Sequence, residues 1–143
     1  MPTVTSPIKK GFAPIFTTDK RIRTMNKCVD EKEEAFDRLK TFRSLTEGWD
    51  GYSAVPIKIE VISAAQSLLE KIPAVPEVFP TLAGNVQLQF EDDKGNYLEL
   101  EIKENYKAEM FAEIEGVAQE ERIVNLGDDT EWECLMKLIK VFA

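Results

Sequence analysis

Residues 86–102 read VQLQFEDDKGNYLELEI, and this stretch decides the fold. Apolar and polar residues alternate on both sides of the turn-forming run DDKG at 92–95. A period of two places alternate side chains on opposite faces of a strand, so the stretch predicts an antiparallel hairpin with one buried face. The pairing that gathers every apolar residue on that face joins Val86 to Ile102, Leu88 to Leu100 and Phe90 to Leu98.

Strand patterns continue on both sides of this hairpin. Alternation over residues 108–114 predicts a third strand, and residues 117–125 predict a weaker fourth. The segment 78–82 is consistent with an edge strand, where Pro80 is tolerated because a free edge has no partner strand. The sequence therefore predicts an antiparallel sheet of four to five strands.

Helical spacing replaces alternation before the sheet. Apolar residues recur every three or four positions over 35–45 and again over 61–72, which predicts two amphipathic helices. The pattern Asp30-x-x-Glu33 is typical of a capping box at the start of the first helix. Gly48 is expected to end the first helix and Pro73 the second.

A third amphipathic helix is expected after the strands. Thr130 and Glu133 form a capping pair, and apolar residues recur at helical spacing from Trp132 to Phe142. Asp128 and Asp129 are interpreted as capping residues. Strands that are grouped between helices indicate an α+β fold with the helices covering one face of the sheet.

Charge divides the chain into two parts. Residues 1–30 carry six basic and two acidic side chains, whereas the other 113 residues carry 12 basic and 24 acidic ones. Because prolines and a glycine interrupt the beginning of the chain, we interpret residues 1–29 as an irregular basic arm and residues 30–143 as a single α+β domain. Blocks of opposite charge favour either an arm that lies on its own domain or separate partners for the two parts.

Composition excludes several kinds of active site. The chain has no histidine, which removes the commonest general base and metal ligand and every Ser-His or Cys-His nucleophile. No glycine-rich phosphate loop is present, and Cys28 and Cys134 lack metal-type spacing. We therefore expect a protein that is not an enzyme and needs no cofactor or metal.

The expected compartment is the cytoplasm. No apolar run approaches the roughly 20 residues that span a bilayer, and the N-terminal stretch has no apolar segment of signal-peptide length. We expect no membrane partner.

The outward side chains of the predicted sheet form an acidic candidate surface. Glu99, Glu101 and Glu109 should project from the face opposite the core, with Glu101 opposite or diagonal to Glu109. Like charges across a sheet are mildly destabilising, and such a cost favours a partner protein with a basic surface. A surface that only promotes solubility is the open alternative.

The basic arm supports a different interpretation. Lys20, Arg21 and Arg23 follow two phenylalanines, a combination that grips phosphates and stacks on bases. The acidic domain would repel a long polyanion, so this hypothesis is limited to a short nucleic-acid contact. A third hypothesis is a carboxylate-dependent or metal-dependent hydrolase that uses the outward glutamates.

The loop GWDGYSAVP, residues 48–56, has two interpretations. As a connector, its glycines adopt positive φ while Trp49 and Tyr52 close the end of the helix pair and Asp50 bonds to turn amides. As a binding loop, Trp49, Asp50 and Tyr52 contact a partner, since Trp and Tyr are enriched at interaction hot spots.

Residues 45–92 resemble a group of small uncharacterised bacterial and phage proteins, in which a Gly-Trp-(Asp or Asn)-Gly-Tyr loop precedes a Pro-x-Val-x-Pro-Thr segment and a strand. The matching positions are Gly48, Trp49, Asp50, Gly51, Tyr52, Pro56, Pro76, Val78, Pro80, Thr81 and Gly84. The resemblance implies a bacterial or phage cytoplasmic setting and little chemistry. Our leading hypothesis is thus a non-catalytic protein that regulates or neutralises a partner protein, as an antitoxin or an anti-defence inhibitor does.

Overall fold

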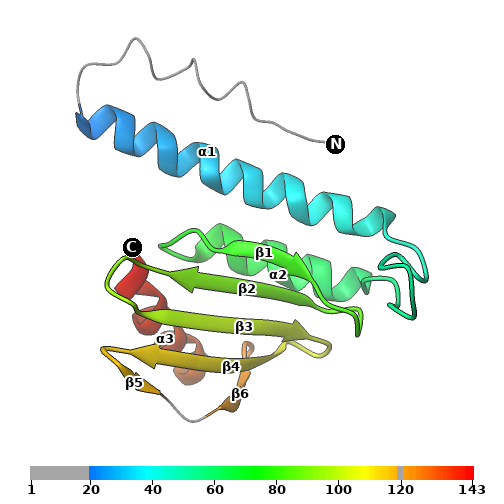
Figure 1. Cartoon of the computed structure of the whole chain (residues 1–143). Helices are drawn as coiled ribbons and strands as arrows, with labels where there is room; N and C mark the ends of the chain where they lie inside the picture. Colours follow the sequence, from blue (N-terminus) through cyan, green and yellow to red (C-terminus); the bar gives the residue numbers. More distant parts are fainter. Residues whose placement is uncertain (1–19, 119–120) are drawn as a thin grey trace. The chain divides into compact units, whose positions relative to one another are not determined.

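The computed structural model describes residues 20–118 and 121–143, with side chains from residue 31 onward. The chain divides into two compact units, Met1–Glu33 and Glu34–Ala143, and the second unit contains the whole sheet. In chain order the elements are α1 (Lys20–Thr41), a 3-10 turn (Phe42–Ser44), α2 (Ile59–Lys71), β1 (Glu77–Pro80), β2 (Val86–Glu91), β3 (Tyr97–Lys103), β4 (Lys107–Ile114), β5 (Val117–Ala118), β6 (Arg122–Asn125), α3 (Asp129–Ile139) and a second 3-10 turn (Lys140–Phe142), as Figure 1 shows.

The strands form an antiparallel sheet in the order β1-β2-β3-β4-β5, and β6 also pairs with β4. The predicted hairpin register is confirmed in full, because Val86 lies opposite Ile102, Leu88 opposite Leu100 and Phe90 opposite Leu98. The turn at 92–95 is also as expected, with Gly95 at a φ of 87°. The alternating pattern specified this pairing, since a slip by one residue would expose every apolar side chain.

The predicted fourth strand differs from the structure. Residues 117–125 form two short strands instead of one, so the sheet has six strands where four to five were predicted. Ala118 pairs with Glu113 in β4, and Arg122 pairs with Met110. This segment therefore has one more residue than the part of β4 opposite it, and a single continuous ladder cannot form.

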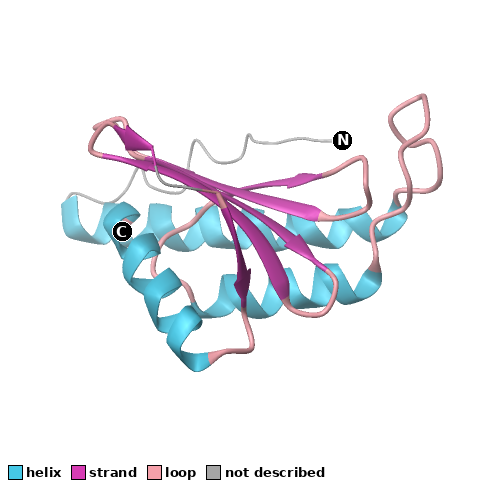
Figure 2. Ribbon diagram, turned by 90° about the horizontal axis from the view of Figure 1, so that it is seen from below, coloured by secondary structure: helices cyan, strands magenta, loops and turns pink. Residues whose placement is uncertain are grey.

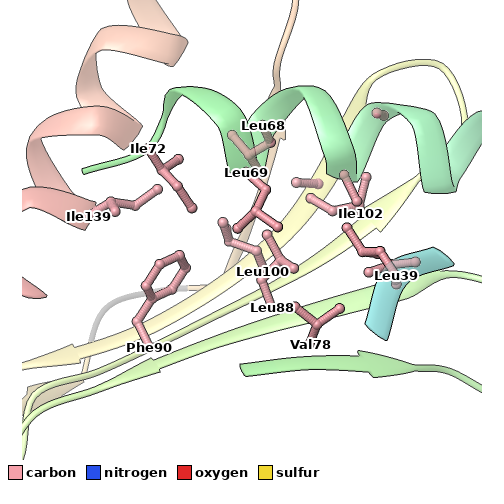
Figure 3. Packing of buried hydrophobic residues seen from close by; sticks show 14 of the residues in the cluster. Leu39, Leu68, Leu69, Ile72, Val78, Leu88, Phe90, Leu100, Ile102 and Ile139 are labelled. Carbon is pink, nitrogen blue, oxygen red and sulfur yellow. The ribbon is translucent and has the colours of Figure 1, made fainter. Parts of the chain in front are cut away.

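The helices of the second unit cover one face of the sheet, as predicted for an α+β fold (Figure 2). Buried side chains from α2, α3 and the last turns of α1 meet those of β1–β4 in one core (Figure 3). Its largest fully buried side chains are Phe90, Leu39, Ile62, Leu68, Leu69, Leu88, Leu98, Leu100, Ile102, Leu135, Ile139 and Val61. Full burial of each such side chain stabilises the fold by about 1.5–3 kcal/mol.

The start and the end of α1 were predicted wrongly. The helix begins at Lys20, so residues 20–29 are helical instead of irregular, while residues 1–19 of the predicted arm lie outside the described residues. No glycine or proline interrupts 20–41, and the Lys and Arg residues there favour helix, so the Asp30 pattern has nothing to cap. The helix ends at Thr41, before Gly48, because the Leu45 N–H bonds to the Phe42 carbonyl and tightens the last turn.

The cap of α3 is Asp128 and not Thr130. Asp128 has extended backbone, and its Oδ1 accepts a hydrogen bond of 3.0 Å from the Glu131 N–H. Thr130 lies inside the first turn, where its backbone is already helical. The interpretation of Asp128 as a capping residue is confirmed.

The edge strand β1 is protected from further pairing. The Arg38 Nε donates to the Val78 carbonyl at 2.5 Å, and the Arg38 guanidinium lies 5.6 Å from the centre of the Phe79 ring. The Val78 carbonyl points away from β2, and backbone groups two residues apart in a strand point to the same side. The position of Pro80 at which another residue would have an N–H therefore also faces away from β2. Pro80 therefore costs the sheet no hydrogen bond, as expected for an edge strand.

Candidate functional site

The face of the sheet opposite the helices is the main candidate surface. Within Glu34–Ala143 no helix covers it (Figure 2). We call the outward side chains of β2, β3 and β4 the outer face; they are Gln87, Gln89, Glu91, Tyr97, Glu99, Glu101, Lys103, Lys107, Glu109, Phe111 and Glu113. Each alternates along its strand with the buried residues of the core.

Glu99, Glu101 and Glu109 all lie on this face, and Glu101 is directly opposite Glu109. Both carboxylates of that pair have partners in the chain. The Asn85 Nδ2 donates to Glu101 at 3.0 Å, and the Lys103 ammonium donates to Glu109 at 2.6 Å. The bond to Glu109 raises the pKa of Lys103 above its ordinary value, with burial acting in the opposite direction. The expected repulsion is therefore offset within the sheet.

The next two outward cross-strand pairs of β3 and β4 each combine a carboxylate with an aromatic ring. The Tyr97 and Phe111 rings lie with their centres 6.3 Å apart, and across the strands Glu99 is opposite Phe111 and Glu113 is opposite Tyr97. The Tyr97 hydroxyl donates to Glu99 at 2.6 Å and accepts from the Gln89 amide at 2.5 Å. Burial, followed by the bond to Glu99, raises the pKa of Tyr97. Rings and carboxylates thus occupy alternate corners of a quadrilateral.

The outer face consequently has two different ends. The lysine end contains Lys103 and Lys107 and borders a hollow of about 390 Å³ that is lined mainly by charged residues, where Lys58 lies 3.6 Å from Glu104. The acidic-aromatic end consists of Glu91, Tyr97, Glu99, Phe111 and Glu113, and its outward strand positions carry no Lys or Arg. A cation that approaches this end meets carboxylates without a basic neighbour on the strands.

Sequence reasoning missed Tyr97 and Phe111 as site residues. Each occupies an outward position in a strand whose register was predicted or implied, so the alternation contained the signal. Aromatic residues are ordinarily assigned to the core, and for this reason Tyr97 and Phe111 were not considered as surface residues.

The loop of residues 48–56, which we call the Trp-Tyr loop, is held in place mainly by hydrogen bonds of its own side chains. Trp49 packs partly against the core, and its Nε1 donates to the Val55 carbonyl at 2.8 Å. The Asp50 Oδ1 accepts from the N–H groups of Tyr52 at 2.9 Å and Ala54 at 3.1 Å. The Tyr52 N–H is the main cause that lowers the pKa of Asp50. Trp49 and Asp50 are placed as the connector interpretation expects, whereas Tyr52 is 87% exposed, does not close the end of the helix pair and is accessible to a partner.

A second contact fixes the loop against the turn before β2. The Val55 N–H donates to the Leu82 carbonyl and the Lys58 N–H to the Gly84 carbonyl, both at 3.1 Å. A Cβ at Gly84 would lie 2.7 Å from the Pro56 carbonyl oxygen, so only glycine fits there without movement.

The remaining sequence-predicted site residues lie at the start of α1. Lys20, Arg21 and Arg23 belong to its first turns, and their side chains are outside the part that the structure describes. The nucleic-acid hypothesis therefore stays a prediction.

Other site classes were considered over the described residues. Between 31 and 143, apart from 119 and 120, no group of three or more Asp, Glu or Cys side chains is placed to hold a metal ion. Cys134 is a free, exposed thiol. None of the helices in the described part of the chain is long and apolar enough to cross a membrane.

Comparison of the chain with protein-family models, with curated proteins and with solved structures gives no match. The resemblance of residues 45–92 to small bacterial and phage proteins therefore stays a prediction.

Proposed function

We propose that the protein is a non-catalytic interaction protein that binds, and so regulates or neutralises, a partner protein with a basic surface. The observation that carries this proposal is the outer face, a sheet surface rich in carboxylates that no helix of its unit covers. Antitoxins and anti-defence inhibitors are the kinds of regulator that the sequence resemblance suggests.

The charge of the domain supports a basic partner. Residues 31–143 carry 24 acidic and 12 basic side chains, an excess that accelerates the approach of a positively charged surface. Within the outer face, Glu109 is paired with Lys103, whereas Glu91, Glu99 and Glu113 form no ion pair with any described side chain. The acidic-aromatic end is therefore the proposed centre of binding.

The chemistry of that end suits cationic side chains. A Lys or Arg placed near the Tyr97 and Phe111 rings gains a cation-π interaction of about 0.5–2 kcal/mol. The same cation reaches Glu99, whose position is fixed by the Tyr97 hydroxyl. Hydrogen bonds between a cation and a carboxylate are roughly twice as strong as those between neutral groups. Because the Glu99 side chain is already held in place, binding costs little of its conformational entropy.

The proposal is tested by affinity capture from bacterial lysate, in parallel samples with and without nuclease. Four forms of the full-length protein are compared: the wild type, E91K/E99K/E113K at the acidic-aromatic end, E101K/E109K at the lysine end, and E34K/E47K/E70K as a control with exposed glutamates outside the sheet. We expect one basic protein to be captured by the wild type and by the control, and to be lost with E91K/E99K/E113K. Reversal of closely contacting charges costs several kcal/mol, which is well over a hundredfold in affinity.

Three results would contradict the proposal. Equal capture by the acidic-aromatic variant and the control would exclude this end as the binding surface. Loss with the control as well would indicate a non-specific effect of net charge. Recovery of nucleic acid alone, from samples without nuclease, would favour the contact through Lys20, Arg21 and Arg23 instead.

A further inference from the structure

A groove on the helical side of the domain has the opposite charge to the outer face. It lies between the end of α2 and α3 and has a volume of about 470 Å³. We call it the lysine groove; its lining residues are Lys71, Pro73, Trp132, Glu133, Met136, Lys137 and Lys140.

Three of the 12 basic side chains in residues 31–143 meet at this groove. The Lys71 Nζ lies 5.7 Å from the centre of the Trp132 ring. Among the side chains that the structure describes, Lys71, Lys137 and Lys140 form no ion pair within 4.0 Å, and Glu133 is the single acidic residue of the lining. On an acidic domain this is a concentration of lysines without an ion-pair partner.

The floor of the groove is apolar. Trp132 and Met136 are partly buried against the core and lie one turn apart on α3, and Pro73 closes the side next to α2. Methionine adapts to side chains of different shape, and an indole ring provides a large flat contact. The groove thus has an apolar floor, which we call the apolar seat, with lysine ammonium groups around it.

The surrounding helix ends disfavour a phosphate more than a carboxylate. Lys71 is the last residue of α2, and Lys137 lies in the last turn of α3, so the negative ends of both helix dipoles point toward this region. The described lining includes no helix N-terminus, which is the usual place for a phosphate. A singly charged carboxylate is repelled less than a doubly charged phosphate and still pairs with an ammonium group.

We infer that the lysine groove binds a short acidic peptide segment of a partner protein, with an apolar side chain on Trp132 and Met136 and carboxylates on Lys71, Lys137 and Lys140. A volume of about 470 Å³ accommodates a few side chains of a bound segment. This inference is independent of the function proposed for the outer face, because the two surfaces attract ligands of opposite charge.

The test is an NMR titration of the ¹⁵N-labelled full chain with the acetylated, amidated peptide Asp-Asp-Leu-Phe-Asp-Asp. We expect shifts of the Trp132 indole N–H and of the α3 amides. K137E/K140E should weaken binding at least about tenfold, equivalent to roughly 1.4 kcal/mol. K94E/K107E, which makes the same change of net charge away from the groove, should bind as the wild type does. Loss of binding to a peptide with serine in place of leucine and phenylalanine would support the apolar seat.

Several outcomes would overturn the inference. These are equal affinities of the groove variant and its control, absence of shifts at millimolar peptide, and shifts by inorganic phosphate as large as those by the peptide. A dimer in sedimentation that K137E/K140E converts to a monomer would assign the groove to a second copy of the chain. E91K/E99K/E113K should still bind the peptide, so failure of the proposed function and failure of this inference are distinguished.

Discussion

The two faces of the β2–β3 hairpin share one backbone and differ in almost everything else. Leu88, Leu100 and their neighbours on the covered face are fully buried, whereas the residues between them remain in contact with water. The covered face specifies the register, since its apolar side chains must all meet the helices. The outer face does not have to pack against the helices, so its side chains can be ones that bind a partner.

The outer face itself shows a second difference. At the lysine end, Glu101 accepts a hydrogen bond from Asn85, and the charge of Glu109 is paired with that of Lys103. At the acidic-aromatic end, Glu113 has no such partner among the described side chains, and the rings of Tyr97 and Phe111 lie beside it. A count of acidic residues therefore does not locate a binding surface, because a glutamate that is paired with a lysine contributes little net charge to it.

The largest predicted effect tests the difference between the faces directly. Leu100→Ala should lower the free energy of unfolding by about 2–5 kcal/mol, because it leaves a cavity in the core. Glu113→Ala, on the outer face of the adjacent strand, should change it by no more than about 0.5 kcal/mol. Urea denaturation followed by circular dichroism measures both. Similar losses in the two variants would show that the outer face is also part of the stabilising structure.

A smaller effect is expected where the loop meets the turn before β2. Gly84 and Gly51 have similar φ angles, 84° and 90°, so alanine is strained at both. At Gly84 the added Cβ would also lie 2.7 Å from the Pro56 oxygen, whereas at Gly51 it meets nothing within 4 Å. Gly84→Ala should therefore cost about 1–3 kcal/mol more than Gly51→Ala in the same denaturation experiment. Equal costs would mean that the loop is not packed against this turn.

The smallest effect concerns Asp50, a partly exposed residue whose carboxylate has a structural role. Asp50→Ala should lower the melting temperature at pH 7, because the N–H groups of Tyr52 and Ala54 lose their acceptor. The pKa of Asp50 is lowered from 3.8 in the folded protein, so the stabilisation is complete above 3.8 and is lost as the pH falls through the lower, folded value.

The measurement for Asp50 is a series of thermal melts of wild type and variant from neutral to acidic pH. The difference in melting temperature should be constant above pH 3.8 and should shrink below it. Asp93→Ala is the control, since Asp93 accepts no hydrogen bond from any group in the described part of the chain. A difference that does not depend on pH would mean that the ionised form of Asp50 has no special role.

Much of the fold was predictable because it depends on local periodicity. The period of two in β2 and β3 predicted the register, and the helical spacing in 61–72 predicted α2, whose apolar residues from Val61 to Leu69 are buried. The start of α1 was missed because a capping pattern can occur inside a helix when nothing interrupts the chain before it. The division of 117–125 into β5 and β6 depends on a register with β4 that no local pattern contains.

The candidate sites divide in the same way. The alternation of apolar and charged residues determined, from the sequence alone, that Glu99, Glu101 and Glu109 share the outward face. Only the tertiary structure decided that Lys103 and Asn85 engage two charges of that row, and that Lys71 of α2 joins Lys137 of α3 at one groove. The physical reason is range: strand and helix periods are local properties of the chain, whereas the neutralisation or accumulation of charge depends on distances that packing creates between segments remote in sequence.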